Sequence, residues 1–175
     1  MGSKCKVQAM SRLAIRHYAQ NLRKRLGLEN TMRVDILYLA ENIFPILFQK
    51  YGYNFMVLPK EEMGRNHGLT NPKSGQVMIR EDIYEGACKG VGRDRMTIAH
   101  ELGHFLLHDG ITLGLARVDP AENIPCYCDP EWQAKAFAGE FLMSADLISH
   151  MSPEEIAREC GVSVQAAECQ KRTLK

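Results

Sequence analysis

Apolar residues recur every three or four positions along the first part of the chain, which is the spacing of an amphipathic helix. Residues 8–26 form the first such segment, and Gly27 is a typical helix stop. A second helix is expected over residues 34–49, where Pro45 should kink or end it because proline lacks an amide hydrogen. The pattern therefore predicts that the chain begins with helices.

The pattern changes in the middle of the chain, where short runs of strand-forming residues alternate with turns. Residues 53–58 favour a strand. Residues 67–70 and 77–80 flank the turn-forming sequence NPKSGQ, which is typical of a β-hairpin. A loop rich in glycine and charged residues is expected over residues 85–93. A small sheet or hairpin should therefore lie between the helical parts.

Helical spacing returns at about residue 94, with Ile98, Leu102, Phe105 and Leu106 on one face and Gly110 as the stop. Capping residues predict the later helices: Asp129 before Pro130, Ser152 in a capping box, Gly161 as a stop and Ser163 as a final cap. The whole pattern predicts an α+β fold that is mostly helical. We divide it into an N-terminal helical arm (1–30), a core (31–150) and short C-terminal helices packed on the core (151–175).

Composition narrows the class of protein. The 175 residues are 45% hydrophobic and 25% charged, as in a globular protein with an apolar core. The net charge of +1 gives no sign of direct nucleic-acid binding, and no apolar run is long enough for a membrane span. The amino terminus lacks an export signal, so we expect a cytoplasmic protein. Its six cysteines should then be reduced thiols, and the Cys126–Cys128 pair alone is weak support for a second metal site.

The most informative residues are His100, Glu101 and His104, which form an H-E-x-x-H motif on the helix that begins near residue 94. Histidines four positions apart lie on the same face of a helix and can bind one metal ion. Glu101 lies beside the first histidine, where it can accept a proton from water. The motif predicts a zinc site with Glu101 as its catalytic base.

A catalytic zinc normally has three protein ligands, so a third is needed. His108 is too far from His100 to share an ion, because eight residues of helix span about 12 Å, and we expect it to contact carbonyl groups at the helix end. On the helix from Pro130, Glu131 lies at the margin of the apolar face, whereas Glu140 points to the opposite side. If the apolar face packs toward the motif helix, Glu131 should point in and Glu140 should point out. We favour Glu131 as the ligand; the alternatives are Glu140 and a purely helix-stabilising role for Glu131.

Two segments resemble the ImmA/IrrE family of zinc metallopeptidases: residues 94–108 (DRMTIAHELGHFLLH) and 131–143 (EWQAKAFAGEFLM). The similarity spans about residues 30–172. It departs at Ser144, where proline is usual, and at Lys135, where a small polar residue is usual. The resemblance implies a compact zincin-like domain with a small sheet beside the active-site helix and Glu131 as the third zinc ligand. It also implies a protein substrate: a repressor-like transcription regulator of mobile elements or stress responses.

The inferred chemistry is peptide hydrolysis, in which zinc polarises the scissile carbonyl and Glu101 transfers the proton of the attacking water. His67 and Tyr84 are candidates for contacting the oxyanion or the substrate, although sequence alone cannot place them near the metal. An extended peptide could add to an exposed strand of the 67–80 hairpin.

The main alternative is a regulatory or DNA/protein-binding module with a structural zinc and no turnover. Residues 156–163 resemble the first helix and turn of a helix-turn-helix unit. Few basic residues follow them, however, so two short packed helices explain the tail better. A further interpretation is that the basic N-terminal helix docks a partner through its cationic residues, although such runs are usually solvated: Arg12, Arg16, Arg23, Lys24 and Arg25.

Overall fold

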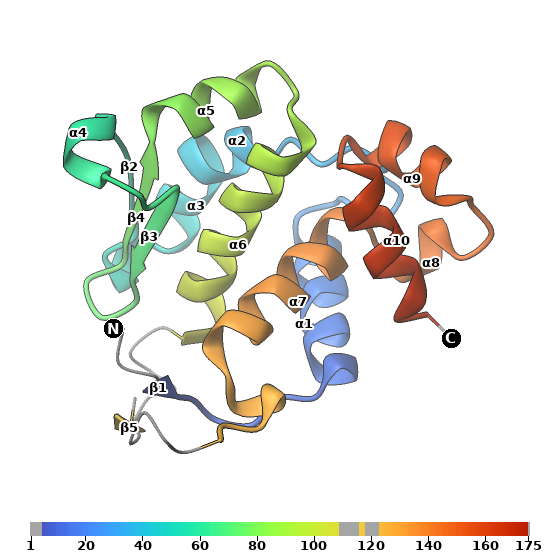
Figure 1. Ribbon diagram of the computed structural model, residues 1–175, viewed down its shortest axis with the longest axis horizontal. Helices are drawn as coiled ribbons and strands as arrows, with labels where there is room; N and C mark the ends of the chain where they lie inside the picture. The colour runs from blue at the N-terminus through green and yellow to red at the C-terminus, as the bar shows by residue number, and fades with distance from the viewer. Residues whose placement is uncertain (1–4, 109–115, 118–122, 175) are drawn as a thin grey trace.

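The computed structural model describes residues 5–108, 116–117 and 123–174, which fold as an α+β domain that is mostly helical (Figure 1). The predicted fold class is confirmed. In chain order the elements are β1 (Cys5–Lys6), α1 (Arg12–Arg25), α2 (Ile36–Tyr38), the π-helix η1 (Leu39–Ile43), α3 (Phe44–Leu47), the 3-10 helix η2 (Gln49–Tyr51), β2 (Asn54–Leu58), α4 (Lys60–Met63), β3 (Gly68–Asn71), β4 (Gln76–Arg80), α5 (Glu81–Cys88), α6 (Gly92–His108), β5 (Ala116–Arg117), the 3-10 helix η3 (Cys126–Cys128), α7 (Pro130–Leu142), α8 (Ala145–Ile148), α9 (Pro153–Cys160) and α10 (Val164–Arg172).

Helix α6 lies in the middle of the molecule, between the sheet with α5 and the long helix α7 (Figure 1). The face of α7 turned away from α6 is covered by α1, so α7 is packed on both sides. Gly103 allows the close approach of α6 and α7, because a Cβ there would lie 3.2 Å from the Cα of Ala134. This central pair of helices holds the motif residues.

The sheet has three strands in the order β2-β4-β3. Strands β3 and β4 form the predicted antiparallel hairpin, with Leu69 opposite Met78, and β2 pairs with β4 in parallel. In the described part of the chain no strand pairs with the other edge of β3, which lies next to α6. The hairpin therefore presents an open edge beside the motif helix.

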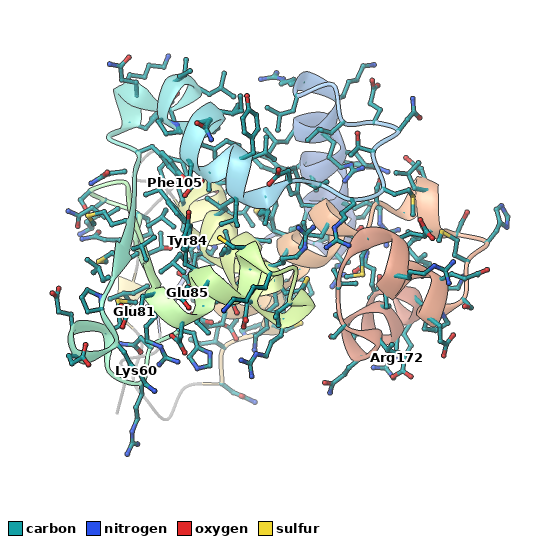
Figure 2. All side chains as sticks on the ribbon, turned by 90° about the horizontal axis from the view of Figure 1, so that it is seen from above. Lys60, Glu81, Tyr84, Glu85, Phe105 and Arg172 are labelled. Atoms are coloured by element: carbon teal, nitrogen blue, oxygen red, sulfur yellow. The ribbon has the colours of Figure 1, made fainter. Side chains whose placement is uncertain are left out.

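The apolar stripe predicted on α6 forms part of the core. Ile98, Leu102 and Phe105 are buried. The ring of Phe105, labelled in Figure 2, meets Phe48 and Tyr53 edge to face, at centroid separations of 5.4 and 4.9 Å. These contacts fix the rotation of α6 about its axis, because the apolar face must point to the sheet side.

Two predictions about helices need correction. The segment expected to be a loop over residues 85–93 is largely helical, since α5 runs to Cys88 and α6 starts at Gly92. The helix expected from residue 8 begins at Arg12. The helical segment expected over 34–49 spans residues 36–47. The interruption predicted at Pro45 is present as a π-helical turn just before it, and Pro45 lacks the amide hydrogen for a helical hydrogen bond. The predicted stop at Gly110 lies outside the described residues.

The caps predicted for the later helices are confirmed. Asp129 caps α7, Ser152 and Glu155 form a capping box on α9, Gly161 ends α9 in the left-handed region and Ser163 caps α10. Helix α10 then contacts α7 and α1: Gln170 of α10 accepts a hydrogen bond from Arg12 of α1. Among the described residues no helix is both long and apolar enough to cross a membrane.

The prediction that Glu140 points away from the core is wrong. Its side chain is fully buried and accepts hydrogen bonds from Arg12 Nε at 2.7 Å and Arg16 Nε at 3.0 Å. Arg23 of the same basic helix is also buried and donates to the carbonyl of Phe141. Several of the cations on α1 therefore bind groups of α7 and hold the two helices together.

Candidate metal centre

His100, His104 and Glu131 come together at the junction of α6 and α7. The two Nε2 atoms are 3.1 Å apart. The Glu131 carboxylate closes the triangle, with Oε2 at 3.3 Å from His100 Nε2 and Oε1 at 3.2 Å from His104 Nε2. In the described part of the chain this is the only group of three or more such side chains arranged to hold a metal ion.

The dimensions of this triangle fit a metal ion. Ligand atoms about 2.0–2.1 Å from a tetrahedral ion are separated from one another by about 3.3 Å. The donor set of two imidazoles and one carboxylate is also one used by catalytic zinc sites. The Glu131 side chain is 60% exposed, so one side of the triangle is open to solvent and could admit water or a substrate.

The start of α7 places Glu131 in this position. Asp129 accepts a hydrogen bond from the Glu131 amide, and Pro130 begins the helix, so the carboxylate projects from the first turn. Contact with the imidazole of His100, and with that of His104, holds the pKa of the Glu131 carboxyl well below its usual range. Glu131 is therefore ionised and available as an anionic ligand.

Glu101 is buried and lies against β3. The Thr70 hydroxyl donates to its Oε2 at 2.7 Å and also contacts its backbone oxygen at 3.1 Å. Gly68 leaves room for the same carboxylate, since a Cβ at that position would lie 2.5 Å from Glu101 Cγ. The edge strand therefore fixes the position of the glutamate of the motif.

His108 was expected to contact carbonyl groups at the helix end, and this prediction is wrong. It is buried, its Nδ1 is 3.2 Å from His104 Nδ1 and its Nε2 is 3.0 Å from Gln133 Oε1. Burial lowers the pKa of His108 to about 4, so the ring is neutral at physiological pH. Sequence reasoning missed this contact and Gln133, although the four-residue spacing from His104 to His108 was a usable signal.

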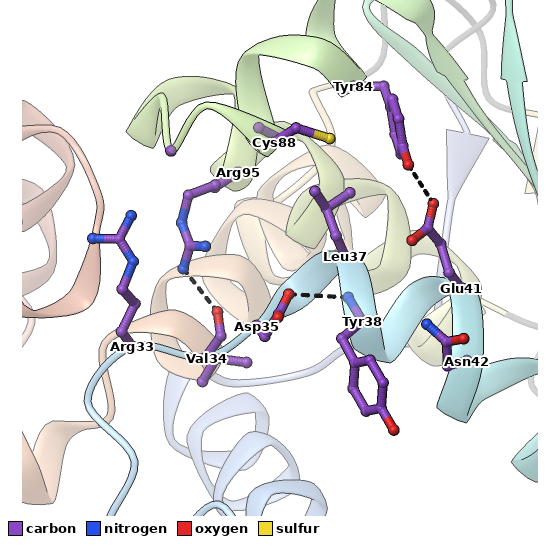
Figure 3. Close-up of a pocket in the computed structure, with 12 residues that line it drawn as sticks. Arg33, Val34, Asp35, Leu37, Tyr38, Glu41, Asn42, Tyr84, Cys88 and Arg95 are labelled. Atoms are coloured by element: carbon purple, nitrogen blue, oxygen red, sulfur yellow. Dashed lines mark hydrogen bonds between the residues drawn. The ribbon is translucent and has the colours of Figure 1, made fainter.

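His67 and Tyr84, the candidates for contacting the oxyanion or the substrate, line different cavities. His67 lines a cleft of about 480 Å³ together with His100 and Glu101. Tyr84 instead lines a separate cavity of about 580 Å³, where its hydroxyl donates to Glu41 at 2.6 Å (Figure 3). That hydrogen bond raises the pKa of Tyr84. The structure brings His67 to the cleft beside the cluster, and it does not bring Tyr84 there.

The fold and the cluster together define a metallopeptidase-like domain, and comparison with known families supports this class. A family model described as Peptidase M78, IrrE N-terminal-like domain, matches residues 48–170, well over half of the chain. The chain belongs to this family, which confirms the resemblance seen in the sequence. The family is one of peptidases and implies a metal ion. No curated protein matches the chain.

Proposed function

We propose that the protein is a zinc-dependent endopeptidase. The observation that carries this proposal is the triangle of His100, His104 and Glu131, with Glu101 beside it but outside the set of ligand atoms. The direct test is hydrolysis of a library of quenched fluorescent peptides by the zinc-loaded protein. Cleavage that stops with a chelator and returns with zinc supports the proposal; no cleavage of any peptide by the zinc-loaded protein contradicts it.

Each side chain has a distinct role in the proposed reaction. His100, His104 and Glu131 hold the zinc ion, which supplies Lewis acidity toward the peptide carbonyl and water. Glu101 takes a proton from the attacking water and delivers it to the leaving amine. His67, which lines the same cleft, is the candidate donor to the oxyanion that develops on the carbonyl.

The substrate is proposed to be a protein partner that binds as an extended segment. The open edge of β3 offers backbone groups to which a peptide can add as a further strand, beside Glu101. The family resemblance favours a repressor-like transcription regulator in the cytoplasm as that partner. Incubating candidate repressors with the zinc-loaded protein and measuring the mass of the fragments tests this choice, and intact repressors would contradict it.

Replacing Thr70 with valine should lower kcat by about tenfold or more, because a hydrogen bond to a charged group contributes about 1.5–3 kcal/mol. The side chains are similar in size, but valine cannot donate to Glu101. Steady-state kinetics on a cleaved peptide, with zinc affinity measured in parallel, checks this. Thr70→Ser keeps the hydroxyl and should retain most activity; equal rates for the valine variant and the wild type would contradict the role of Thr70.

The cleft also has a charge pattern that should select substrates. Arg65, Arg93 and Lys135 line it, and among the described lining residues Glu101 is the only carboxylate. Arg65 and Lys135 are exposed, with no ion pair in the described part of the chain. Since these three cations line the cleft together with the apolar side chains of Met96 and Ala138, we propose that the cleft accepts an acidic side chain near the scissile bond.

Reversing the charge at Lys135 should therefore change substrate preference. In Lys135→Glu, kcat/KM should fall about tenfold for a peptide with glutamate beside the scissile bond, and much less for its glutamine analogue. The matched control is Arg25→Glu, which reverses an exposed charge on α1 outside the cleft. Equal cleavage of both peptides by the wild type and by Lys135→Glu would contradict an acidic preference.

A further inference from the structure

Residues outside the metal cluster, including the backbone of the N-terminal segment, are connected to it by hydrogen bonds. We propose that His108, Gln133 and the carbonyl of Gln8 are positioning groups of the metal centre, which together fix the tautomer and orientation of His104. Gln8 lies outside the region matched by the family model, residues 48–170. The inference rests on the proposed function only in taking His104 as a metal ligand.

The chain of hydrogen bonds starts at two backbone carbonyls. Gln133 is buried, and its Nε2 is 2.8 Å from the carbonyl oxygen of Gln8 and 2.8 Å from that of Tyr127. Carbonyl oxygens only accept hydrogen bonds, so the amide nitrogen of Gln133 must face them. Its Oε1 therefore points to His108 as an acceptor.

This arrangement determines the position of the protons on both histidines. Because Gln133 Oε1 accepts, His108 Nε2 carries the hydrogen. The second nitrogen of a neutral imidazole is an acceptor, so His108 Nδ1 accepts from His104 Nδ1 at 3.2 Å. His104 Nε2 is then left with a lone pair, and it faces His100 Nε2 and Glu131 Oε1.

A lone pair facing a carboxylate oxygen at 3.2 Å is repulsive unless a proton or a cation lies between them. The hydrogen-bond chain thus prepares His104 Nε2 to bind a cation together with its neighbours. Hydrogen bonds of this kind behind a ligating histidine hold the ring and increase its basicity. Without His108, the Nδ1 hydrogen of His104 would have no fixed acceptor and the ring could turn or change tautomer.

Hydrogen bonds to η3 hold the N-terminal segment next to Gln133. Val7 donates its amide to the carbonyl of Cys128 at 3.0 Å, and Met10 donates to Tyr127 at 2.8 Å. The Val7 side chain is buried. These contacts place the intervening Gln8 carbonyl beside Gln133 and secure η3, which leads into the start of α7 and Glu131.

The test is zinc affinity, measured by competition with a chromophoric chelator. His108→Phe and Gln133→Leu should each weaken zinc binding by about 10–100-fold. His108→Asn places an acceptor oxygen near the position of Nδ1 and should restore most of the affinity. The control is His150→Phe, which replaces an exposed histidine between α8 and α9 and should bind zinc like the wild type.

A matched pair of truncations tests the N-terminal segment. A chain starting at Met10 loses the Gln8 carbonyl and should bind zinc at least tenfold more weakly. A chain starting at Val7 loses β1 but keeps Val7 and Gln8, and it should bind zinc like the full chain. Circular dichroism of each metal-free variant establishes that it is folded before the affinities are compared.

The outcomes separate the inference from the proposed function. If the full chain binds zinc tightly and the folded variants bind it equally tightly, the positioning roles are wrong and the proposed function stands. If the full chain itself binds no zinc, the proposed function fails. Loss of affinity in His108→Phe and Gln133→Leu, with recovery in His108→Asn and a difference between the two truncations, supports the inference.

Discussion

Replacing Glu101 with glutamine should lower peptide hydrolysis by about a thousandfold while leaving zinc affinity unchanged, because a positioned general base contributes about 10²–10⁴-fold to rate. Glutamine keeps the size of the side chain and can still accept the hydrogen bond from Thr70. It cannot take a proton from water at neutral pH. The loss should therefore appear in kcat, with little change in KM or in bound zinc.

The experiment compares steady-state rates and zinc affinity in Glu101→Gln, the wild type and Glu62→Gln. Glu62 is an exposed carboxylate on α4, so its replacement controls for the loss of one negative charge. A Glu101→Gln variant that keeps more than a tenth of the wild-type rate would show that another group acts as the base. A variant that loses zinc would place Glu101 among the ligands.

Replacing Glu140 with alanine should lower the free energy of unfolding by about 3 kcal/mol, because it leaves the charges of Arg12 and Arg16 without their buried partner. Both arginines are partly exposed, with 27% and 19% of their side chains accessible, so water relieves part of the cost. We therefore expect the lower end of the range of about 3–5 kcal/mol measured for breaking buried pairs.

Urea unfolding followed by circular dichroism measures this change on the metal-free protein. Glu168→Ala is the matched control, since Glu168 is exposed on α10 and should change stability by less than about 0.5 kcal/mol. A loss below about 1 kcal/mol in Glu140→Ala would mean that the contacts between α1 and α7 depend on apolar packing and that the buried ion pairs add little.

Glu131 and Glu140 show which positions on α7 could be predicted from the sequence and which could not. Helical periodicity correctly predicted that the two carboxylates lie on different faces of α7 and that Glu131 faces the motif helix. The prediction that Glu140 points out was wrong. The face that carries it is covered by α1, so Glu140 meets arginines from a segment more than 120 positions away. Periodicity along one helix cannot say what covers its second face.

The missed helix α5 and the missed role of His108 have a similar cause. Gly86 belongs to the stretch predicted to be a loop, but it lies inside α5. A side chain at this position would clash with the carboxylate of Asp94 on α6, so the close approach of the two helices requires glycine here. The distance from His100 correctly excludes His108 as a ligand of the same ion, but it does not reveal that the partners of His108 are His104 and Gln133 of α7. Both features depend on contacts between helices. The motif, the caps and the hairpin depend on neighbours in sequence and were predicted.

The most direct test of the proposed zinc site is the zinc content of the purified protein, measured by native mass spectrometry for the wild type, Glu131→Gln and Glu101→Gln. We expect one zinc ion per chain in the wild type and in Glu101→Gln, and weakened binding in Glu131→Gln. Full zinc retention in Glu131→Gln would remove Glu131 from the ligand set. A wild-type protein that takes up no zinc even after reconstitution would contradict the proposed metallopeptidase.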